Sequence, residues 1–335
     1  MPQLPELVQA LLKPKAYPET PQWIELVQTQ MSFVFLTDNY VYKVKKPVNL
    51  GYLDYTTLDK RRFYCQREVE LNRRLCANVY LGVVPIIREK GDIFIGGQGE
   101  DIEYAVKMRR LPQEAMMDVL LTKNQVSSEM VSSVAERLEE FHREAETNAN
   151  ISTFGDLDTI TQNTEENFTQ TEKYIGTTIS QEKYQRIKDY TNSFIRQNTS
   201  LFHKRIADGK IKDCHGDLHA AHICFSNGIC IYDCIEFNDR FRYCDIASEV
   251  AFLAMDLDHY GRADLSRSFV NAYVERSQDK QILELLNFYK CYRAYVRGKV
   301  QSFKFDDPYI SEGEKARVLA TARRYFELAE LYVQN

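Results

Sequence analysis

Residues 211–245 of the chain, IKDCHGDLHAAHICFSNGICIYDCIEFNDRFRYCD, decide its fold. Two short apolar runs in this stretch flank the turn sequence Ser-Asn-Gly at 226–228. An Asn-Gly pair between apolar runs is typical of a tight turn, so the stretch predicts a two-stranded hairpin. Asp217 lies in the loop before the hairpin and Asp233 directly follows its second strand. The sequence therefore predicts two carboxylates at one end of the hairpin.

The residues before this stretch predict a mostly antiparallel sheet within the first 108 residues. Residues 24–48 are rich in β-branched and aromatic side chains, with a turn at Asp38-Asn39, and residues 56–76 have helical composition. Further strands are predicted over 83–89, 92–97 and 102–111. One long helix is thus expected after the third strand of the sheet.

After Leu111-Pro112 the composition becomes helical, apart from the stretch quoted above. Helices are predicted over 113–122, 126–145, a pair across 163–208, 246–258, 263–276, 280–303 and 312–333. The polar residues 146–162 predict a long loop. The expected fold class is α+β, with a small antiparallel β lobe that contains one helix and a larger, mainly helical lobe.

The composition is that of a folded protein and does not indicate a polyanionic partner. The chain has 335 residues, of which 44% are hydrophobic and 27% charged, and its formal net charge is −5. We therefore expect no nucleic acid and no anionic membrane surface as a partner. The N-terminus lacks a cationic head before an apolar run, and no apolar run reaches about eighteen residues, so we expect no signal peptide, no membrane span and a cytoplasmic location.

Eight cysteines raise three alternatives: a zinc site, disulfides or buried thiols. Five of the cysteines fall between Cys214 and Cys244 and are interleaved with histidines, but no C-x-x-C pair occurs, which argues against zinc. Cys224 and Cys230 lie in apolar strand-like runs, and a chain without a secretion signal seldom forms disulfides. Buried, reduced thiols are the favoured interpretation, and a metal scaffold on the Cys/His cluster is a rival.

The carboxylates around the hairpin suit phosphoryl transfer. Transfer of a γ-phosphoryl group needs a carboxylate to orient the attacking hydroxyl, side chains that hold Mg²⁺ between the phosphates, and a cation on the α- and β-phosphates. Asp217 and Asp233 fit the first two of these roles. Each residue alone has a plainer explanation, such as a strand-end turn residue for Asp233. Their occurrence in one order along the chain favours the interpretation as a site.

HGDLHAAHICF and IYDCIEF, followed by DIA at 245–247, resemble the catalytic loop and metal-binding segment of the aminoglycoside phosphotransferases. The resemblance covers nearly the whole chain and is strongest to bacterial aminoglycoside phosphotransferase-like predicted kinases. It implies a protein-kinase-like, two-lobed fold, with a nucleotide-binding lobe at 1–108, a hinge at 109–112 and a catalytic and acceptor-binding lobe at 113–335. In that group such a module is often fused to a P-loop kinase, and because no G-x-x-x-x-G-K-[ST] string occurs here, that second domain is not expected.

The resemblance further implies an ATP-dependent kinase with Mg²⁺ as its metal ion. Asp217 would be the catalytic aspartate and Asp233 the Mg²⁺ ligand. Lys43, in the strand sequence VYK, would grip the nucleotide phosphates, and Glu68 of the following helix would pair with it.

Other residues have supporting roles by the same resemblance. The segment that links the lobes, Val106-Lys107-Met108-Arg109, would bind adenine through its backbone. His215 would be structural, and Asp245 would begin the following helix and brace the catalytic loop.

The chain departs from the family pattern at two points. The catalytic loop usually has Asn five residues after the aspartate, as a metal ligand, and here that residue is His222. Imidazole suits Mn²⁺ or Zn²⁺ better than Mg²⁺, so Mn²⁺ as the metal ion and a catalytically silent nucleotide-binding protein are both alternatives. No G-x-G-x-x-G string is present either, and the turn from Gln30 to Ser32 is the candidate for covering the phosphates, with Ser32 in contact with the nucleotide.

The acceptor is expected to be a small molecule. Only twelve positions separate Asp233 from Asp245, and no A-P-E string follows, which leaves little room for the activation segment of a regulated protein kinase, the rival interpretation. Lys290, Arg293 and Arg297 share one face of a predicted helix. If that face lines the cleft, Arg293 and Arg297 would bind an anionic acceptor, and otherwise it is an ordinary solvated face.

Overall fold

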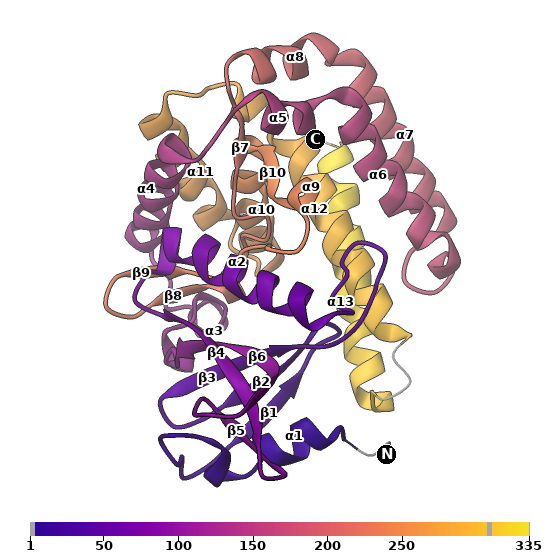
Figure 1. The fold of residues 1–335 in the computed structure, drawn as a ribbon. Helices are drawn as coiled ribbons and strands as arrows, with labels where there is room; N and C mark the ends of the chain where they lie inside the picture. Colours follow the sequence, from indigo (N-terminus) through magenta and orange to yellow (C-terminus); the bar gives the residue numbers. More distant parts are fainter. Residues whose placement is uncertain (1–3, 307–309, 335) are drawn as a thin grey trace. The chain divides into compact units, whose positions relative to one another are not determined.

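The computed structural model describes residues 4–306 and 310–334. The chain divides into two compact units, of which unit 1 comprises Met1–Met116 and His222–Asp239 and unit 2 comprises Met117–Ala221 and Arg240–Asn335. The predicted hairpin therefore groups with the N-terminal residues, although it lies in the second half of the sequence. Figure 1 shows a sheet with one long helix in unit 1 and a helical unit 2.

In the described part of unit 1, six strands form one sheet in the order β1-β2-β3-β6-β4-β5. All its pairings are antiparallel, in line with the mostly antiparallel sheet that the sequence predicted. The strands are β1 (Glu25–Gln28), β2 (Ser32–Leu36), β3 (Tyr40–Lys45), β4 (Tyr80–Glu89), β5 (Asp92–Ile95) and β6 (Glu100–Arg109). Because side chains alternate along a strand, Tyr42 and Val44 of β3 lie in one core while Lys43 and Lys45 point to the opposite face.

Each face of this sheet is covered by a different segment. Helix α1 (Glu6–Leu11), which the sequence analysis missed, contributes Val8 and Leu11 to the core around Tyr42. Helix α2 (Leu58–Cys76) begins at Thr57, whose side chain accepts a hydrogen bond from the Lys60 N–H, and packs against β4 and β6 (Figure 1). The long helix after the third strand is therefore confirmed.

The predicted hairpin consists of β8 (Ile223–Phe225) and β9 (Ile229–Ile231), which pair antiparallel. Cys230 of β9 and Cys76, the last residue of α2, are joined by a disulfide, with their Cα atoms 4.7 Å apart. The expectation of reduced thiols is therefore wrong for this pair, while the other six cysteines are thiols. The two cysteines are 154 residues apart, so only the fold reveals that they meet.

Unit 2 is mainly helical. Its helices and strands are α3 (Met117–Thr122), α4 (Ser128–Glu144), α5 (Ala149–Ser152), α6 (Leu157–Thr171), α7 (Gln181–Gln197), α8 (Thr199–Ala207), β7 (Ile211–Asp213), β10 (Tyr243–Asp245), α10 (Ile246–His259), α11 (Ala263–Ser277), α12 (Ile282–Phe305) and α13 (Glu312–Gln334), and the short α9 (Asp239–Arg242) begins at the boundary between the units. Helices α12 and α13 pack closely (Figure 1), since a Cβ at Gly298 would lie only 2.8 Å from the Phe326 ring.

Two sequence predictions for unit 2 were wrong. Residues 146–162 do not form one long loop, because α5 begins after Asn148, whose side chain caps it, and α6 begins at Leu157. The region 163–208 holds parts of three helices and not a pair. The short antiparallel pairing of β7 with β10 was also missed. Within the described residues, no helix combines the length and the apolar character that a membrane span requires.

Candidate active site

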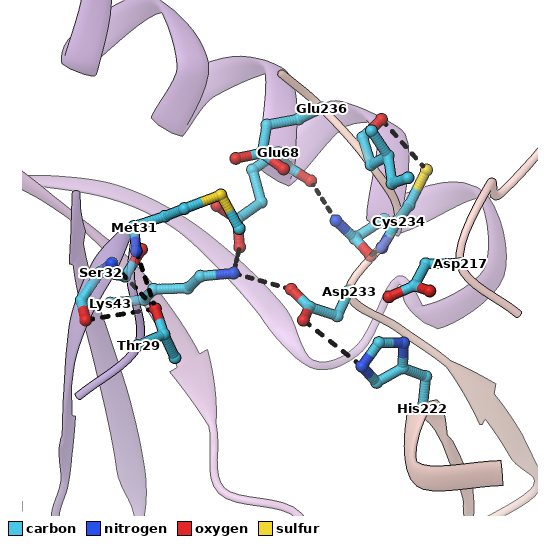
Figure 2. A network of polar contacts seen from close by, with 12 residues as sticks. Thr29, Met31, Ser32, Lys43, Glu68, Asp217, His222, Asp233, Cys234 and Glu236 are labelled. Carbon is cyan, nitrogen blue, oxygen red and sulfur yellow. Dashed lines mark hydrogen bonds and ion pairs between the residues drawn. The ribbon is translucent and has the colours of Figure 1, made fainter. Parts of the chain in front are cut away.

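Two lysines of β3 and one glutamate of α2 form the centre of the site in unit 1. Glu68 is fully buried, and each of its carboxylate oxygens faces one lysine. Oε1 lies 2.9 Å from Lys43 Nζ, and Oε2 lies 2.7 Å from Lys45 Nζ. Figure 2 shows the extended Lys43 side chain reaching Glu68. The predicted Lys43–Glu68 ion pair is therefore present.

The electrostatics of this cluster favour charged side chains. Burial alone would raise the pKa of Glu68, but Lys43 and Lys45 outweigh it and hold that pKa below its usual range. Burial alone would lower the pKa of Lys43, but Asp233 and Glu68 raise it well above its ordinary value. The lysine and the glutamate thus stay ionised at neutral pH.

Asp233 joins the cluster from the end of β9. Its φ of 63° is in the left-handed region, which aspartate tolerates better than most residues. The Asp233 N–H donates to the Tyr80 hydroxyl at 3.2 Å, and the Cys234 N–H donates to Asn72 Oδ1 at 2.8 Å. With its backbone fixed in this way, Asp233 places Oδ1 2.7 Å from Lys43 Nζ (Figure 2).

His222 faces the second carboxylate oxygen of Asp233. The Tyr232 N–H donates to the His222 carbonyl at 3.0 Å, which holds the histidine beside the end of β9. His222 Nε2 lies 3.5 Å from Asp233 Oδ2, and Figure 2 shows the ring turned toward that carboxylate. His222, which occupies the position of the usual Asn metal ligand, therefore faces Asp233.

These two side chains are a donor set that fits a divalent cation shared with phosphate oxygens. The Asp233 side chain is 39% exposed, so a ligand can reach it. A metal ion bound with a nucleotide usually takes only one or two protein ligands, so a carboxylate and an imidazole would suffice to hold one here. An imidazole would suit Mn²⁺ better than Mg²⁺.

A second buried ion pair, which the sequence analysis missed, lies beside the first. Lys45 Nζ contacts Glu236 Oε1 as well as Glu68, and the Tyr55 hydroxyl donates to the same oxygen of Glu236 at 2.6 Å. Lys45 is 1% exposed and Glu236 is 7% exposed. The Glu236 carboxylate is therefore buried and held by Lys45 and Tyr55.

The candidate phosphate-covering turn between β1 and β2 is held by Thr29. Thr29 Oγ1 accepts the N–H groups of Met31 at 3.3 Å and Ser32 at 2.9 Å, and Ser32 is buried (Figure 2). For Ser32 to contact a nucleotide through its backbone, a phosphate would have to replace the Thr29 hydroxyl at these donors.

The residues expected to bind adenine lie inside the sheet. Lys107 and Met108 each have partners in both β3 and β4, and the Arg109 N–H donates to the Val79 carbonyl at 2.9 Å. The Lys107 side chain is bound to Glu19. The expectation that the backbone of 107–109 binds adenine is therefore wrong, because the sheet already occupies these groups. The segment after β6, from residue 110, is the nearer candidate.

The loop that carries Asp217 is held within unit 2 by one buried carboxylate of α10. Glu249 Oε1 accepts the N–H groups of His215 at 2.9 Å and Gly216 at 2.6 Å, and Oε2 lies 2.8 Å from His142 Nε2. Gly216 has a φ of 89°, which favours glycine. His215 is fully buried, and its Nδ1 accepts the Asp217 N–H at 3.2 Å.

Asp245 begins α10, as the resemblance implied, and its Oδ1 accepts the Ala247 N–H at 2.8 Å. Its carboxylate also forms an ion pair with the fully buried Arg205, at 2.7 Å. Glu249, one turn along α10, is the carboxylate that braces the Asp217 loop, so the bracing role assigned to Asp245 belongs to Glu249.

The basic face of α12 is largely buried and satisfied. Lys290 donates to Asp258 at 2.9 Å, and Arg293 donates to the Gly216 carbonyl at 3.2 Å. Arg293 therefore positions the Asp217 loop and is not an open anion-binding group, which corrects its assignment to the acceptor. Arg297 contacts a different kind of group, since its Nη1 lies 3.3 Å from the imidazole Nε2 of His219.

Two of the residues that the sequence analysis missed have a signal in the sequence. Glu249 is an acid within the apolar sequence IASEVAFLAM, and Lys45 is a second lysine on the same face of a strand whose other face is apolar. A charge at a position that the periodicity assigns to the interior needs a buried partner, which is the clue to Glu249, while the clue to Lys45 is its place beside Lys43 on one face of the strand.

We predict that Glu249 makes the unfolding free energy depend on pH. Burial opposes its charge, but His142 and His215 hold its pKa at about 2, against 4.5 ordinarily. Its contribution is complete above pH 4.5 and is lost as the pH falls toward 2. Glu249→Gln should cost about 3 kcal/mol at pH 7, and denaturant unfolding should show this difference shrink at acid pH.

The exposed Glu284→Gln in unit 2 is the matched control and should stay near the wild type throughout. A Glu249→Gln defect of the same size at pH 3 and pH 7 would contradict the assignment.

Comparison with known proteins gives relatives in sequence and in fold, and no family model matches the chain. Uncharacterised proteins of Mycobacterium tuberculosis and Mycobacterium bovis are 33% identical over 322 residues. This covers 96% of the chain and 62% of those proteins, so the chain spans less than two thirds of the length of the curated relatives it matches.

Among solved structures, a choline/ethanolamine kinase family protein from Mesorhizobium loti superposes with a TM-score of 0.51, covering 97% of this chain and 98% of that one. An aminoglycoside phosphotransferase from Alicyclobacillus acidocaldarius superposes with a TM-score of 0.50, covering 99% and 96%. Both are 11% identical to this chain, a likeness of fold. The α+β fold of this chain is thus the protein-kinase-like fold of the aminoglycoside phosphotransferases and the choline/ethanolamine kinase family.

Proposed function

We propose that the chain is an ATP-dependent phosphotransferase that moves the γ-phosphate of ATP to a hydroxyl of a small molecule. The observation that carries this proposal is the meeting of Lys43, Glu68 and Asp233 within unit 1 (Figure 2). A strand lysine, a helix glutamate and a carboxylate after a hairpin are the groups with which kinases hold a metal-bound nucleotide. The fold that the chain shares with known kinases independently supports the proposal.

Lys43 is placed to neutralise the nucleotide phosphates, with Glu68 holding its ammonium group in position. Asp233 and His222 would hold Mg²⁺ or Mn²⁺, which when bound neutralises charge between the β- and γ-phosphates. Lys43 and Asp233 pair with one another at 2.7 Å. Nucleotide binding then exchanges this ion pair for a lysine–phosphate contact and frees the aspartate for the metal ion.

Asp217 orients the acceptor hydroxyl and takes its proton. The hydroxyl oxygen attacks the γ-phosphorus, the bond to the β-phosphate oxygen breaks, and ADP leaves. The Asp217 side chain is 34% exposed and its loop is fixed by Glu249, so the carboxylate is both accessible and held in place.

An anionic acceptor is favoured by Arg297 of unit 2. Its Nη1 lies 3.3 Å from His219 Nε2, which in turn lies 3.6 Å from Asp217 Oδ2. A guanidinium group this close to the catalytic carboxylate suits phosphate or carboxylate groups, whereas aminoglycosides and choline are cations. A screen of hydroxyl-bearing metabolites for stimulated ATP consumption would identify the acceptor, and consumption stimulated by cationic acceptors alone would contradict this assignment.

We predict that Asp217→Asn retains the fold and nucleotide binding but loses phosphoryl transfer by a factor of roughly 10²–10⁴, since a positioned carboxylate contributes about that much. The measurement is ADP release with the acceptor found in the screen. Asp208→Asn, which removes an exposed carboxylate of the same unit, is the control and should be fully active. Wild-type turnover by Asp217→Asn would refute the role.

We predict that His222→Asn shifts the metal preference from Mn²⁺ toward Mg²⁺ without abolishing transfer, because an amide oxygen replaces imidazole beside Asp233. The ratio of turnover with Mn²⁺ to turnover with Mg²⁺ should fall about tenfold. His203→Asn makes the same change at an exposed histidine and should leave the ratio unaltered. An unchanged ratio in His222→Asn would make His222 a packing residue.

A further inference from the structure

The site in unit 1 contains more buried charge than a lysine, a glutamate and a metal-binding aspartate require. Lys43 and Lys45 carry two positive charges, and Glu68, Asp233 and Glu236 carry three negative charges. A buried charge is stable only with a partner of opposite sign and with its hydrogen bonds made. The extra pair, Lys45 and Glu236, must therefore serve the arrangement of the other three.

Lys45 is placed as a bridge between two segments that are distant in sequence. Its Nζ contacts Glu68 of α2 and Glu236 of the segment after β9, and it lies 3.4 Å from the Tyr55 hydroxyl. It also lies 4.9 Å from the centre of the Tyr55 ring. At 1% exposure Lys45 cannot touch a ligand, so any effect it has on the site passes through its partners.

Each of the two lysines contacts one carboxylate oxygen of Glu68. Since Lys45 takes Oε2, Lys43 contacts only Oε1 and extends to Asp233. Without Lys45, two buried carboxylates, Glu68 and Glu236, would have Lys43 as the remaining lysine of this cluster. Lys43 would then be drawn inward, away from the exposed carboxylate of Asp233 and from a nucleotide phosphate.

We propose that Lys45 is a positioning residue of the nucleotide site, which neutralises Glu68 and Glu236 so that Lys43 remains available to the phosphates. This inference rests on the proposed function, because it assumes that Lys43 binds a nucleotide. It assigns a second lysine to the site, and it explains why the sequence VYKVK has lysines at both inward positions of the strand. It also assigns Glu236 as the partner of Lys45 and not as a metal ligand.

The test compares Lys45→Met, Glu236→Gln and the double variant by calorimetric binding of a non-hydrolysable ATP analogue with Mn²⁺, together with thermal unfolding. Lys45→Met should weaken binding by at least about tenfold, because an uncompensated carboxylate competes for Lys43. The double variant should bind within about threefold of the wild type, because Glu236 no longer carries the competing charge. Lys15→Met, which removes a surface ion pair with Asp92, is the matched control and should bind like the wild type.

A purely structural role would give a different result. Loss of folded protein lowers the number of binding sites in the titration and leaves the dissociation constant of the remaining sites unchanged. Wild-type affinity in folded Lys45→Met, or a double variant that binds as weakly as Lys45→Met, would overturn the inference. If Lys45→Met does not fold, the double variant alone decides, and its binding more than about tenfold weaker than the wild type would overturn the inference. If the wild type itself binds no nucleotide, the proposed function fails together with the inference.

Discussion

The carboxylate of Glu68 is the constraint on which the site in unit 1 depends. A fully buried carboxylate is costly unless both oxygens are paired, and here each oxygen faces one lysine of the same strand. The two lysines lie on one face of β3 because side chains alternate, so the strand supplies both partners from successive inward positions. From Glu68 the charges extend outward through Lys43 to Asp233 and inward through Lys45 to Glu236. Lys43 and Asp233 can therefore contact a ligand, while Lys45 and Glu236 are buried and hold the cluster in place.

In unit 2, one buried carboxylate, that of Glu249, holds the loop that carries Asp217. Glu249 accepts the backbone N–H groups of His215 and Gly216, so buried hydrogen bonds fix the shape of the loop. Arg293 holds the same loop from the other side by donating to the Gly216 carbonyl. In each unit, then, the aspartate proposed to act on the substrates, Asp233 or Asp217, is partly exposed, while the charged residues that hold it in place are buried. Such preorganisation is what phosphoryl transfer needs from a protein, because its catalysis is mostly positioning and charge stabilisation.

The sequence alone predicted the parts of this arrangement that depend on local pattern. The hairpin around Asn227-Gly228 follows from a short-range signal, and the Lys43–Glu68 pair, which the family resemblance implied, is present. The disulfide between Cys76 and Cys230 could not be predicted, because nothing local marks two cysteines 154 residues apart as neighbours.

The site predictions that the structure corrects also depended on contacts between residues distant in sequence. The spacing of Arg293 suggested either an acceptor-binding face or a solvated one, and only the packing of α12 shows that its guanidinium donates to the Gly216 carbonyl. The sheet likewise occupies the backbone of Lys107 and Met108, which a linear resemblance does not reveal. Spacing gives the face of a helix or strand, and burial, which depends on the whole fold, decides whether that face meets solvent.

The central claim is that Asp233 leaves Lys43 to hold a divalent ion when a nucleotide binds. Electron paramagnetic resonance of Mn²⁺ measures this directly, because the free aqueous ion and the protein-bound ion give different signals. The account predicts that, with an ATP analogue, the wild type binds Mn²⁺ and Asp233→Asn binds it at least about tenfold more weakly, while metal-free binding of the analogue changes little. Equal Mn²⁺ binding by the two proteins would contradict the account.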